Sequence, residues 1–261
     1  MLRDQLHQET PLTRDQTLTV AVLIPALNEE DALPYTLKRL AEYCDRVRSI
    51  GHVKLRWRAP LVVDNGSQDR TVDVAIASGA EVISEPSRGY GSACLAGIQH
   101  LRLDPPDVLL FTDADGSDDL SELERMLSAI SRDPDDQGAA LVIGSRVKFA
   151  ENGALSPLQR FGNALSCSLM RLAFNAHFTD LGPLRLIRWE TLESLDMRDR
   201  DFGWTVEMQA KVAAGSIPYA EVDVTYLNRY AGESKISGNL VGSYRAGVKI
   251  LSTIAKVWWT R

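Results

Sequence analysis

Short apolar runs that stop abruptly at polar residues are the feature of this sequence that most constrains its fold. The runs span residues 19–25, 60–64, 80–85, 108–112 and 140–144. Between them lie segments with the composition and length of helices, at 30–47, 69–78, 91–101 and 120–130. Strands that alternate with helices in this way are typical of βαβ units. The sequence therefore predicts an α/β fold with a mainly parallel sheet flanked by helices.

The second half of the chain departs from this alternation without any linker or repeat. We expect helices at 157–174 and 203–214, a strand at 217–227, and a C-terminal amphipathic helix at about 240–259. Residues 1–18 mix charged and polar side chains and lack the apolar core of a secretory signal. We therefore predict a flexible N-terminal extension at 1–18 and a single domain at 19–261.

Composition and charge argue against several classes of protein. The formal net charge is −6, which disfavours a protein that coats nucleic acid phosphates with Lys and Arg. The three cysteines, Cys44, Cys94 and Cys167, stand far apart without metal-ligand spacing, as is typical of a reducing compartment. No apolar run reaches the roughly 18 residues of a membrane-spanning helix. We expect a cytoplasmic protein.

The acidic motif Asp113-Ala114-Asp115 directly follows the fourth apolar run. Residues i and i+2 of an extended chain point the same way, so both carboxylates would face one point at the carboxyl edge of the sheet. A hard cation such as Mg²⁺ or Mn²⁺ accepts such carboxylates and completes its shell with water and diphosphate oxygens. The alternative is a solvated acidic turn that caps the following helix through Ser117, Asp118 or Asp119.

Two other strand ends carry polar residues. Asp64 closes the second run and is placed to accept hydrogen bonds from a nucleoside, while Ser67 and Asp69 are equally suited to cap the next helix. The first run leads into the segment PALNEE, which would wrap a base or form an ordinary loop with Asn28 as a helix cap.

Taken in order, the motifs of this chain resemble those of the family 2 glycosyltransferases with the GT-A fold, and most closely dolichol-phosphate mannosyltransferases and bacterial polyprenyl-phosphate glycosyltransferases. The motifs are PALNEE, VVDNGSQDRT, RGYGSACLAG, TDADGS, IGSR, GWTVEMQAKVAAG and NRYAGESK, and the likeness runs from Val20 to about Lys249. The sequence departs from the family pattern at Asn65, Pro183 and Asp223. These departures bear on the sugar and the acceptor and leave the metal motif intact.

The resemblance assigns roles to individual residues. Donor binding falls to Pro25, Ala26, Asn28, Glu29, Asp64, Asp113, Ala114, Asp115, Arg229 and Lys235, the metal to Asp113 and Asp115, and acceptor binding to Arg146 and Arg160. Asp115, Arg229 and Lys235 are the expected catalytic residues, because the metal and the two basic side chains would stabilise charge that develops on the leaving diphosphate.

The resemblance implies inverting transfer of a hexose from a GDP- or UDP-sugar to a polyprenyl phosphate. A phosphate acceptor is already anionic and needs no general base, whereas a hydroxyl acceptor would need one, for which Asp180 and Glu207 are candidates. Glu207 would otherwise hold the Lys235 loop by an ion pair. Two alternatives remain open: transfer to a small soluble acceptor such as a phosphorylated glycerate, and a sugar-nucleotide-binding protein without turnover.

The C-terminal segment reverses the sign of the chain. Residues 234–261 contain five Lys or Arg residues and no acid, and apolar side chains recur there at helical spacing. The apolar positions are Leu240, Tyr244, Val248, Leu251, Ala255 and Trp258. Such a helix would associate peripherally with the cytoplasmic face of a membrane or pack on the domain's own core.

Overall fold

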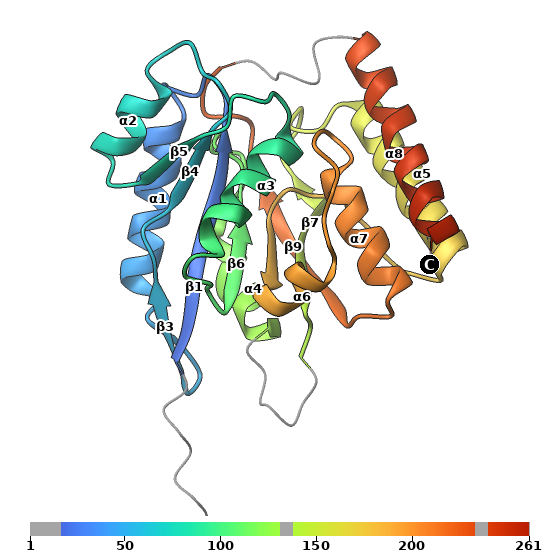
Figure 1. The fold of residues 1–261 in the computed structure, drawn as a ribbon, viewed down its shortest axis with the longest axis horizontal. Helices are drawn as coiled ribbons and strands as arrows, with labels where there is room; N and C mark the ends of the chain where they lie inside the picture. The colour runs from blue at the N-terminus through green and yellow to red at the C-terminus, as the bar shows by residue number, and fades with distance from the viewer. Residues whose placement is uncertain (1–16, 131–137, 233–239, 261) are drawn as a thin grey trace, which may run out of the picture.

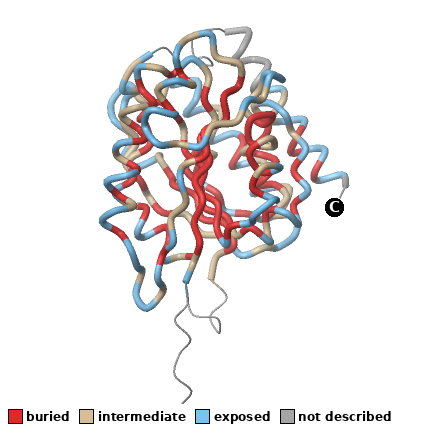
Figure 2. The backbone as a smooth tube through the Cα atoms, turned by 60° about the vertical axis from the view of Figure 1, so that its left-hand side comes forward, coloured by how far each residue is buried: buried red, intermediate tan, exposed pale blue. Residues whose placement is uncertain are grey.

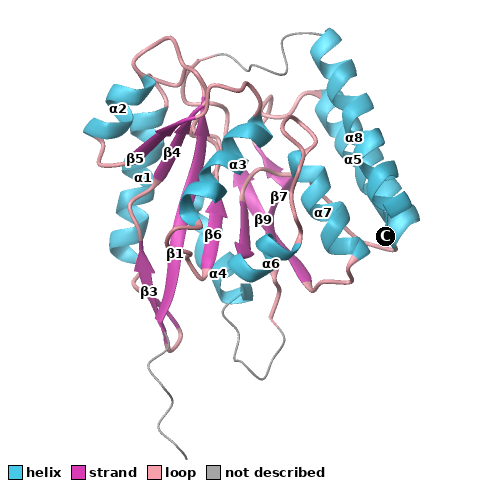
Figure 3. Ribbon diagram, in the orientation of Figure 1, coloured by secondary structure: helices cyan, strands magenta, loops and turns pink. Residues whose placement is uncertain are grey.

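One sheet covered by helices on both faces forms the structure, a computed structural model that describes residues 17–130, 138–232 and 240–260 (Figures 1 and 3). The strands are β1 (Thr17–Ala26), β2 (Ser49–Ile50), β3 (Val53–Trp57), β4 (Leu61–Asp64), β5 (Glu81–Ser84), β6 (Val108–Phe111), β7 (Leu141–Ala150), β8 (Arg185–Arg188) and β9 (Tyr219–Tyr226). The helices are α1 (Leu33–Arg46), α2 (Thr71–Ala77), α3 (Tyr90–Leu101), α4 (Leu123–Ile130), α5 (Pro157–Phe174), α6 (Trp189–Ser194), α7 (Trp204–Ala214) and α8 (Leu240–Thr260).

Strand β1 is the centre of the sheet. Its first residues pair in parallel with β3, its last residues pair in parallel with β4, and its middle pairs in parallel with β6 on the other side. Beyond β6 the antiparallel strand β8 separates β6 from β7, and β9 runs parallel to β7. The predicted mainly parallel sheet flanked by helices is confirmed, with β8 as an antiparallel insertion.

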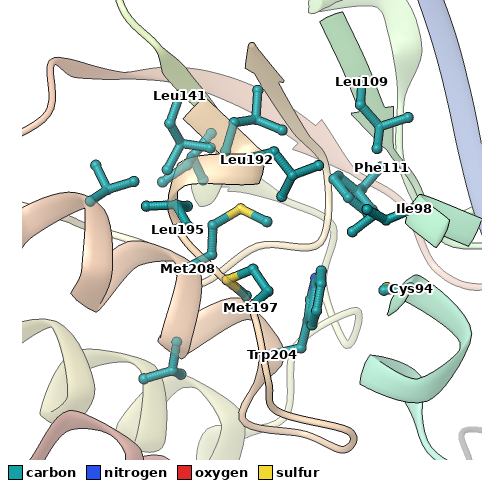
Figure 4. Close-up of a cluster of buried hydrophobic side chains, with 14 of the residues drawn as sticks. Cys94, Ile98, Leu109, Phe111, Leu141, Leu192, Leu195, Met197, Trp204 and Met208 are labelled. Carbon is teal, nitrogen blue, oxygen red and sulfur yellow. The ribbon is translucent and has the colours of Figure 1, made fainter. Parts of the chain in front are cut away.

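Alternate residues of each central strand supply two separate cores. Leu23 of β1 faces a layer formed by α3, α5, α7 and α8, whereas Val22 and Ile24 face a layer formed by α1 and α4. The strands between the two layers are buried along most of their length (Figure 2). In the first layer Trp204 of α7 lies beside Phe111 of β6, with ring centroids 6.2 Å apart (Figure 4). This packing fixes the end of β6, after which the acidic motif begins.

Element boundaries differ from the sequence-based expectations at several points. Helix α1 begins at Leu33 instead of residue 30, because Asn28 adopts a left-handed φ of 50° and Pro34 occupies the first turn. Strands β2, β3 and β8 and helix α6 were not predicted. Strand β1 already includes Thr17 and Leu18, and the rest of the expected N-terminal extension, residues 1–16, lies outside the described residues.

Among the described helices, none is both long enough and apolar enough to cross a bilayer. The last helix, α8, spans nearly the range expected from the sequence and packs against α7 and α5.

Candidate active site

The carboxyl ends of β4, β1 and β6 lie side by side at one edge of the sheet. Ala26 of β1 is in register with Asp64 of β4, and Leu23 of β1 is in register with Phe111 of β6. The segments that follow these strands therefore leave the sheet at the same edge and flank the end of β1. This arrangement matches the predicted convergence of the polar strand ends.

The loop after β6 gathers three carboxylates, those of Asp113, Asp115 and Asp118. Burial raises the pKa of Asp113 well above its ordinary value, and the neighbouring charges of Asp118 and Asp115 raise it further. Burial likewise raises the pKa of Asp118 from 3.8 to about 6, although its carboxylate accepts hydrogen bonds from the Asp113 amide and the Thr112 hydroxyl. Such crowding of buried and half-buried acids is unfavourable unless a positive charge joins them.

Asp115 has a fixed carboxylate. One oxygen accepts hydrogen bonds from the amide of Ser117 at 2.9 Å and from its hydroxyl at 2.5 Å. The other oxygen lies 2.7 Å from Nη1 of Arg229. These contacts hold the Asp115 side chain, which is 6% exposed.

Arg229 joins three motifs that are far apart in the sequence. Its Nη2 lies 2.7 Å from Glu29 in the segment after β1, while its Nη1 contacts Asp115 in the loop after β6. The next residue, Tyr230, donates its amide to the Asp115 carbonyl at 3.0 Å and stacks on Tyr35 of α1 with ring centroids 4.0 Å apart. The NRYAGESK segment therefore begins directly on top of the acidic loop.

The segments after β1 and β4 bind each other. Asn28 donates its amide to the Ser67 hydroxyl and accepts a hydrogen bond from the Gln68 amide at 2.8 Å. Asp64 accepts hydrogen bonds from the amides of Gly66 and Ser67. These contacts place Asn28 and Asp64 at the edge of the sheet where β1 and β4 end. Pro25 and Ala26, the last two residues of β1, lie at the same edge.

The structural alternatives for these polar residues are partly correct. Asp119 caps the short 3₁₀ turn at Leu120–Glu122 by accepting a hydrogen bond from the Ser121 amide. Asp69 accepts hydrogen bonds from the amide and hydroxyl of Thr71 at the start of α2. Asp113 caps no helix, and within the described residues its carboxylate makes no hydrogen bond or ion pair. Asp113 is thus placed differently from the residues beside it, whereas Asp115 accepts from the amide and hydroxyl of Ser117 in the way that Asp119 accepts from those of Ser121.

Arg146, one of the two expected acceptor residues, is engaged by a buried acid. Two of its guanidinium nitrogens bind both carboxylate oxygens of Asp180, at 2.7 and 2.8 Å, and the guanidinium lies over the ring of Tyr226. The neighbouring charge of Arg146 lowers the pKa of both Asp113 and Asp118, so the guanidinium is electrostatically coupled to the acidic loop.

Arg160, the other expected acceptor residue, projects from the first turn of α5 and is exposed. Its Nε donates to the Leu155 carbonyl at 3.3 Å. The described contacts do not join Arg160 to Arg146 or to the acidic loop. Its assignment to the acceptor stays a prediction.

Neither candidate base is a solitary carboxylate. Asp180 is paired with Arg146, and Glu207 of α7 lies 2.8 Å from Lys211 and accepts the amides of Arg198 and Asp199. The suggested ion pair between Glu207 and Lys235 lies outside the described residues, as does Lys235 itself.

Two features of the site region were missed from the sequence. Arg185 of β8 is 1% exposed and donates to the carbonyls of Leu181, Gly182 and Thr205, and burial lowers its pKa to about 10. The glycines of the RGYG motif are the second. A side chain at Gly89 or Gly91 would overlap the carbonyl oxygens of Arg200 and Asp199, so the motif lets the 199–201 loop lie on the first turn of α3. In the sequence, the only sign of this contact is the pair of glycines two residues apart, Gly89 and Gly91.

Asn65, which departs from the family pattern, has a structural role. Its side-chain amide donates to the carbonyls of Glu85 and Ser87, and its oxygen accepts from the Gly89 amide at 2.8 Å. Asn65 therefore ties the end of β4 to the loop that leads into α3.

Comparison with known proteins identifies the class. The family model described as glycosyl transferase family 2 matches residues 21–193. This chain therefore belongs to glycosyltransferase family 2. It is 37% identical over 225 residues to a protein of Mycobacterium tuberculosis (strain ATCC 25618 / H37Rv) named uncharacterized glycosyltransferase, covering 86% of this chain and 92% of the relative.

Two further relatives carry more specific names. The chain is 32% identical over 236 residues to an undecaprenyl-phosphate mannosyltransferase of Micrococcus luteus, covering 86% of this chain and 90% of the relative. It is 31% identical over 252 residues to a polyprenol monophosphomannose synthase of Mycolicibacterium smegmatis, covering 91% and 88% of the two chains.

Solved structures support the GT-A fold. Glucosyl-3-phosphoglycerate synthase from Mycobacterium tuberculosis, in complex with phosphoglyceric acid, superposes with a TM-score of 0.68 at 22% identity, covering 91% of this chain and 80% of that one. Mannosyl-3-phosphoglycerate synthase from Rubrobacter xylanophilus gives a TM-score of 0.67 at 19% identity, covering 92% and 73%. The protein is therefore a glycosyltransferase enzyme with an α/β fold of the GT-A type.

Proposed function

We propose that this enzyme transfers a hexose from a GDP- or UDP-sugar to the phosphate of a polyprenyl phosphate, with inversion and with the help of a divalent cation. The observation that carries the proposal is the junction of Arg229 with Asp115 and Glu29 at the shared edge of β1, β4 and β6. The names of the 32% and 31% identical relatives favour a polyprenyl phosphate as acceptor.

The donor would lie along the edge formed by the segments after β1 and β4. Asp64, Asn28 and Glu29 offer oxygen acceptors there for the base and ribose, beside Pro25 and Ala26. Arg229 and Lys235 would hold the diphosphate, Lys235 from outside the described residues. Arg229 is paired with two carboxylates, and on donor binding it would exchange these partners for phosphate oxygens.

The acidic loop would bind a hard divalent cation through two carboxylates. The Asp113 carboxylate makes no ion pair among the described residues, and one oxygen of Asp118 is buried without a hydrogen-bond partner. Burial, and to a smaller extent the neighbouring carboxylate charges, raise the pKa of both groups. Asp113 and Asp115 would hold Mg²⁺ or Mn²⁺, flanked by the Ala114 backbone, and the cation would neutralise charge on the leaving diphosphate. A structure of the glucosyl-3-phosphoglycerate synthase contains Mn²⁺ with UDP-glucose.

The acceptor side requires positioning more than proton transfer. Asp180 and Glu207 are both held in ion pairs, which disfavours either as a general base. A phosphate monoester is already an anionic nucleophile, so orientation by Arg146 and Arg160 would suffice. Arg146 suits this role because Asp180 and Tyr226 fix the plane of its guanidinium. We further propose that the enzyme works at the cytoplasmic face of a membrane, with α8 as the peripheral contact.

The test is to incubate the protein with membranes and a panel of labelled GDP- and UDP-hexoses, with Mn²⁺, with Mg²⁺ and with EDTA. The proposal expects label in the organic phase from one donor, and none in EDTA. The inactive control is Asp115→Ala.

The other outcomes each select a different function. Label that stays aqueous as a defined glycoside, formed when 3-phosphoglycerate is supplied, would replace the lipid acceptor with a soluble one. Donor binding with no transfer to any acceptor would indicate a sugar-nucleotide-binding protein without turnover. Transfer at full rate in EDTA would remove the cation from the account.

A further inference from the structure

Exposed large apolar side chains are concentrated on two neighbouring helices, α5 and α8. On α5 they are Leu158, Phe161, Leu165 and Leu172, and on α8 they are Val248, Leu251, Trp258 and Trp259. The helices pack side by side at the edge of the molecule, coloured yellow and red in Figure 1. We call these eight residues the α5–α8 surface. A soluble domain rarely exposes so many large apolar groups on adjacent elements without a partner.

Helix α8 turns its predicted apolar stripe toward solvent. Within residues 247–259 of α8, Thr253, Ile254 and Val257 are buried, whereas Val248, Leu251, Ala255 and Trp258, which form the described part of the stripe, are exposed. The described residues of this stripe are therefore not packed on the domain's own core, whereas Ile254 and Val257 of the same helix are.

Helix α5 presents a similar stripe. Leu158, Phe161, Leu165 and Leu172 recur at intervals of three, four and seven residues, which places them on one side of the helix. The residues buried on α5, Ser166, Cys167 and Met170, lie on the opposite side. The amphipathic pattern of α5 is therefore also oriented away from the core.

The charge of the two helices is opposite to that of the chain. α5 contains Arg160 and Arg171, α8 contains Arg245, Lys249 and Lys256, and neither helix contains an acid. The whole chain carries a net charge of −6. The exposed residues Arg160, Arg171 and Lys256 lie on the same helices as the exposed apolar and tryptophan side chains, and such a surface suits the headgroup layer of an anionic bilayer.

We infer that the α5–α8 surface docks on an anionic lipid bilayer, with α5 contributing as much of the contact as the C-terminal helix. This inference rests on the proposed function and deepens it, because a polyprenyl phosphate acceptor resides in such a bilayer. Arg160 lies on the exposed first turn of α5 next to Phe161, so docking brings a proposed phosphate ligand to the lipid headgroups.

The test uses co-sedimentation with vesicles of phosphatidylcholine alone or mixed with phosphatidylglycerol, without donor or acceptor. The α5 variant is Leu172→Glu, and its matched control is Leu103→Glu, because the two leucines are 84% and 85% exposed. Leu251→Glu tests α8. Wild type should bind the mixed vesicles more tightly than the neutral ones, and Leu172→Glu and Leu251→Glu should each weaken binding by roughly tenfold. Leu103→Glu should bind as wild type does.

Several results would overturn the inference. One is wild-type affinity in Leu172→Glu, and another is equal binding to neutral and anionic vesicles. A third is a wild-type dimer, seen by light scattering, that dissociates in Leu172→Glu, because a second copy would then cover the surface.

A water-soluble short-chain polyprenyl phosphate separates this inference from the proposed function. Without vesicles, Leu172→Glu should transfer sugar to it at the wild-type rate. Failure of the wild type to glycosylate any lipid phosphate, with vesicle binding as expected, would refute the proposed function and leave the docking surface standing.

Discussion

The guanidinium of Arg229 lies 2.7 Å from a carboxylate oxygen of Asp115 and 2.7 Å from one of Glu29. One side chain thereby joins the loop after β6, the segment after β1 and the chain beyond β9. The positive charge sits where the proposed function requires a diphosphate and a cation to meet. The ion pairs also explain how two acids and a cationic side chain remain stable together at the edge of the sheet.

Removal of the Arg229 guanidinium should impair chemistry more than folding. We expect Arg229→Ala to lower kcat/KM for sugar transfer by about 100- to 1,000-fold, the range typical of losing one transition-state charge partner. Initial rates and thermal unfolding should be measured on the same preparations. The control is Arg125→Ala on α4, which breaks a partly exposed ion pair with Glu122 of the preceding 3₁₀ turn. Turnover of Arg229→Ala close to that of Arg125→Ala would contradict the role.

Replacement of Gly91 by any residue with a side chain should destabilise the protein. A Cβ there would overlap the Asp199 carbonyl oxygen, so Gly91→Ala should destabilise the protein by about 1–3 kcal/mol through overpacking. Gly162→Ala on α5 meets no atom within 4 Å and should stabilise by about 0.5–1 kcal/mol through helix propensity. Urea denaturation measures both. Equal stabilities of the two variants would show that the 199–201 loop does not press on α3.

The stabilising effect of a divalent cation should depend on pH. In metal-free protein the folded-state pKa of Asp118, about 6, exceeds its ordinary 3.8, so this group's contribution to stability is complete below 3.8 and is lost as the pH rises through 6. Asp113 is shifted in the same direction. A cation binds the ionised carboxylates and reverses this loss. The rise in Tm caused by Mn²⁺ should therefore be small near pH 4.5 and larger near pH 7.5.

Differential scanning fluorimetry with Mn²⁺ and with EDTA checks this pH dependence. Asp113→Asn should show a weaker response to Mn²⁺ near pH 7.5, because it removes one proposed ligand. An equal rise in Tm at both pH values, or an undiminished rise in Asp113→Asn, would argue against cation binding by the acidic loop.

Some of the fold and site could be predicted because the signals are local. The buried strands β1, β4 and β6 are continuous apolar runs, and their order fixes which polar residues share an edge. β8 was missed because the sequence Arg-Leu-Ile-Arg begins and ends with a cationic residue. The burial of Arg185 depends on carbonyls from the 181–182 turn and from Thr205 of α7, which only the folded chain brings together.

The ion pair of Arg146 with Asp180 could not be predicted from the sequence either. The family resemblance associates Arg146 with a phosphate. The residues next to Arg146 in the sequence do not indicate that the distant Asp180 binds its guanidinium. Likewise the helical period of α8 was readable, whereas the face it buries depends on contact with α5 and α7. Long-range contacts decided both, and single-sequence periodicity carries no information about them.

The rate of sugar transfer by Asp115→Ala tests the central claim most directly. It should be measured with the labelled donor that wild type prefers, Mn²⁺ and polyprenyl phosphate, alongside the circular dichroism spectrum and Tm of both proteins. The account predicts a folded variant whose turnover falls by at least about 100-fold, because it loses a cation ligand and the carboxylate that holds Arg229. A folded Asp115→Ala protein with near wild-type turnover would contradict it.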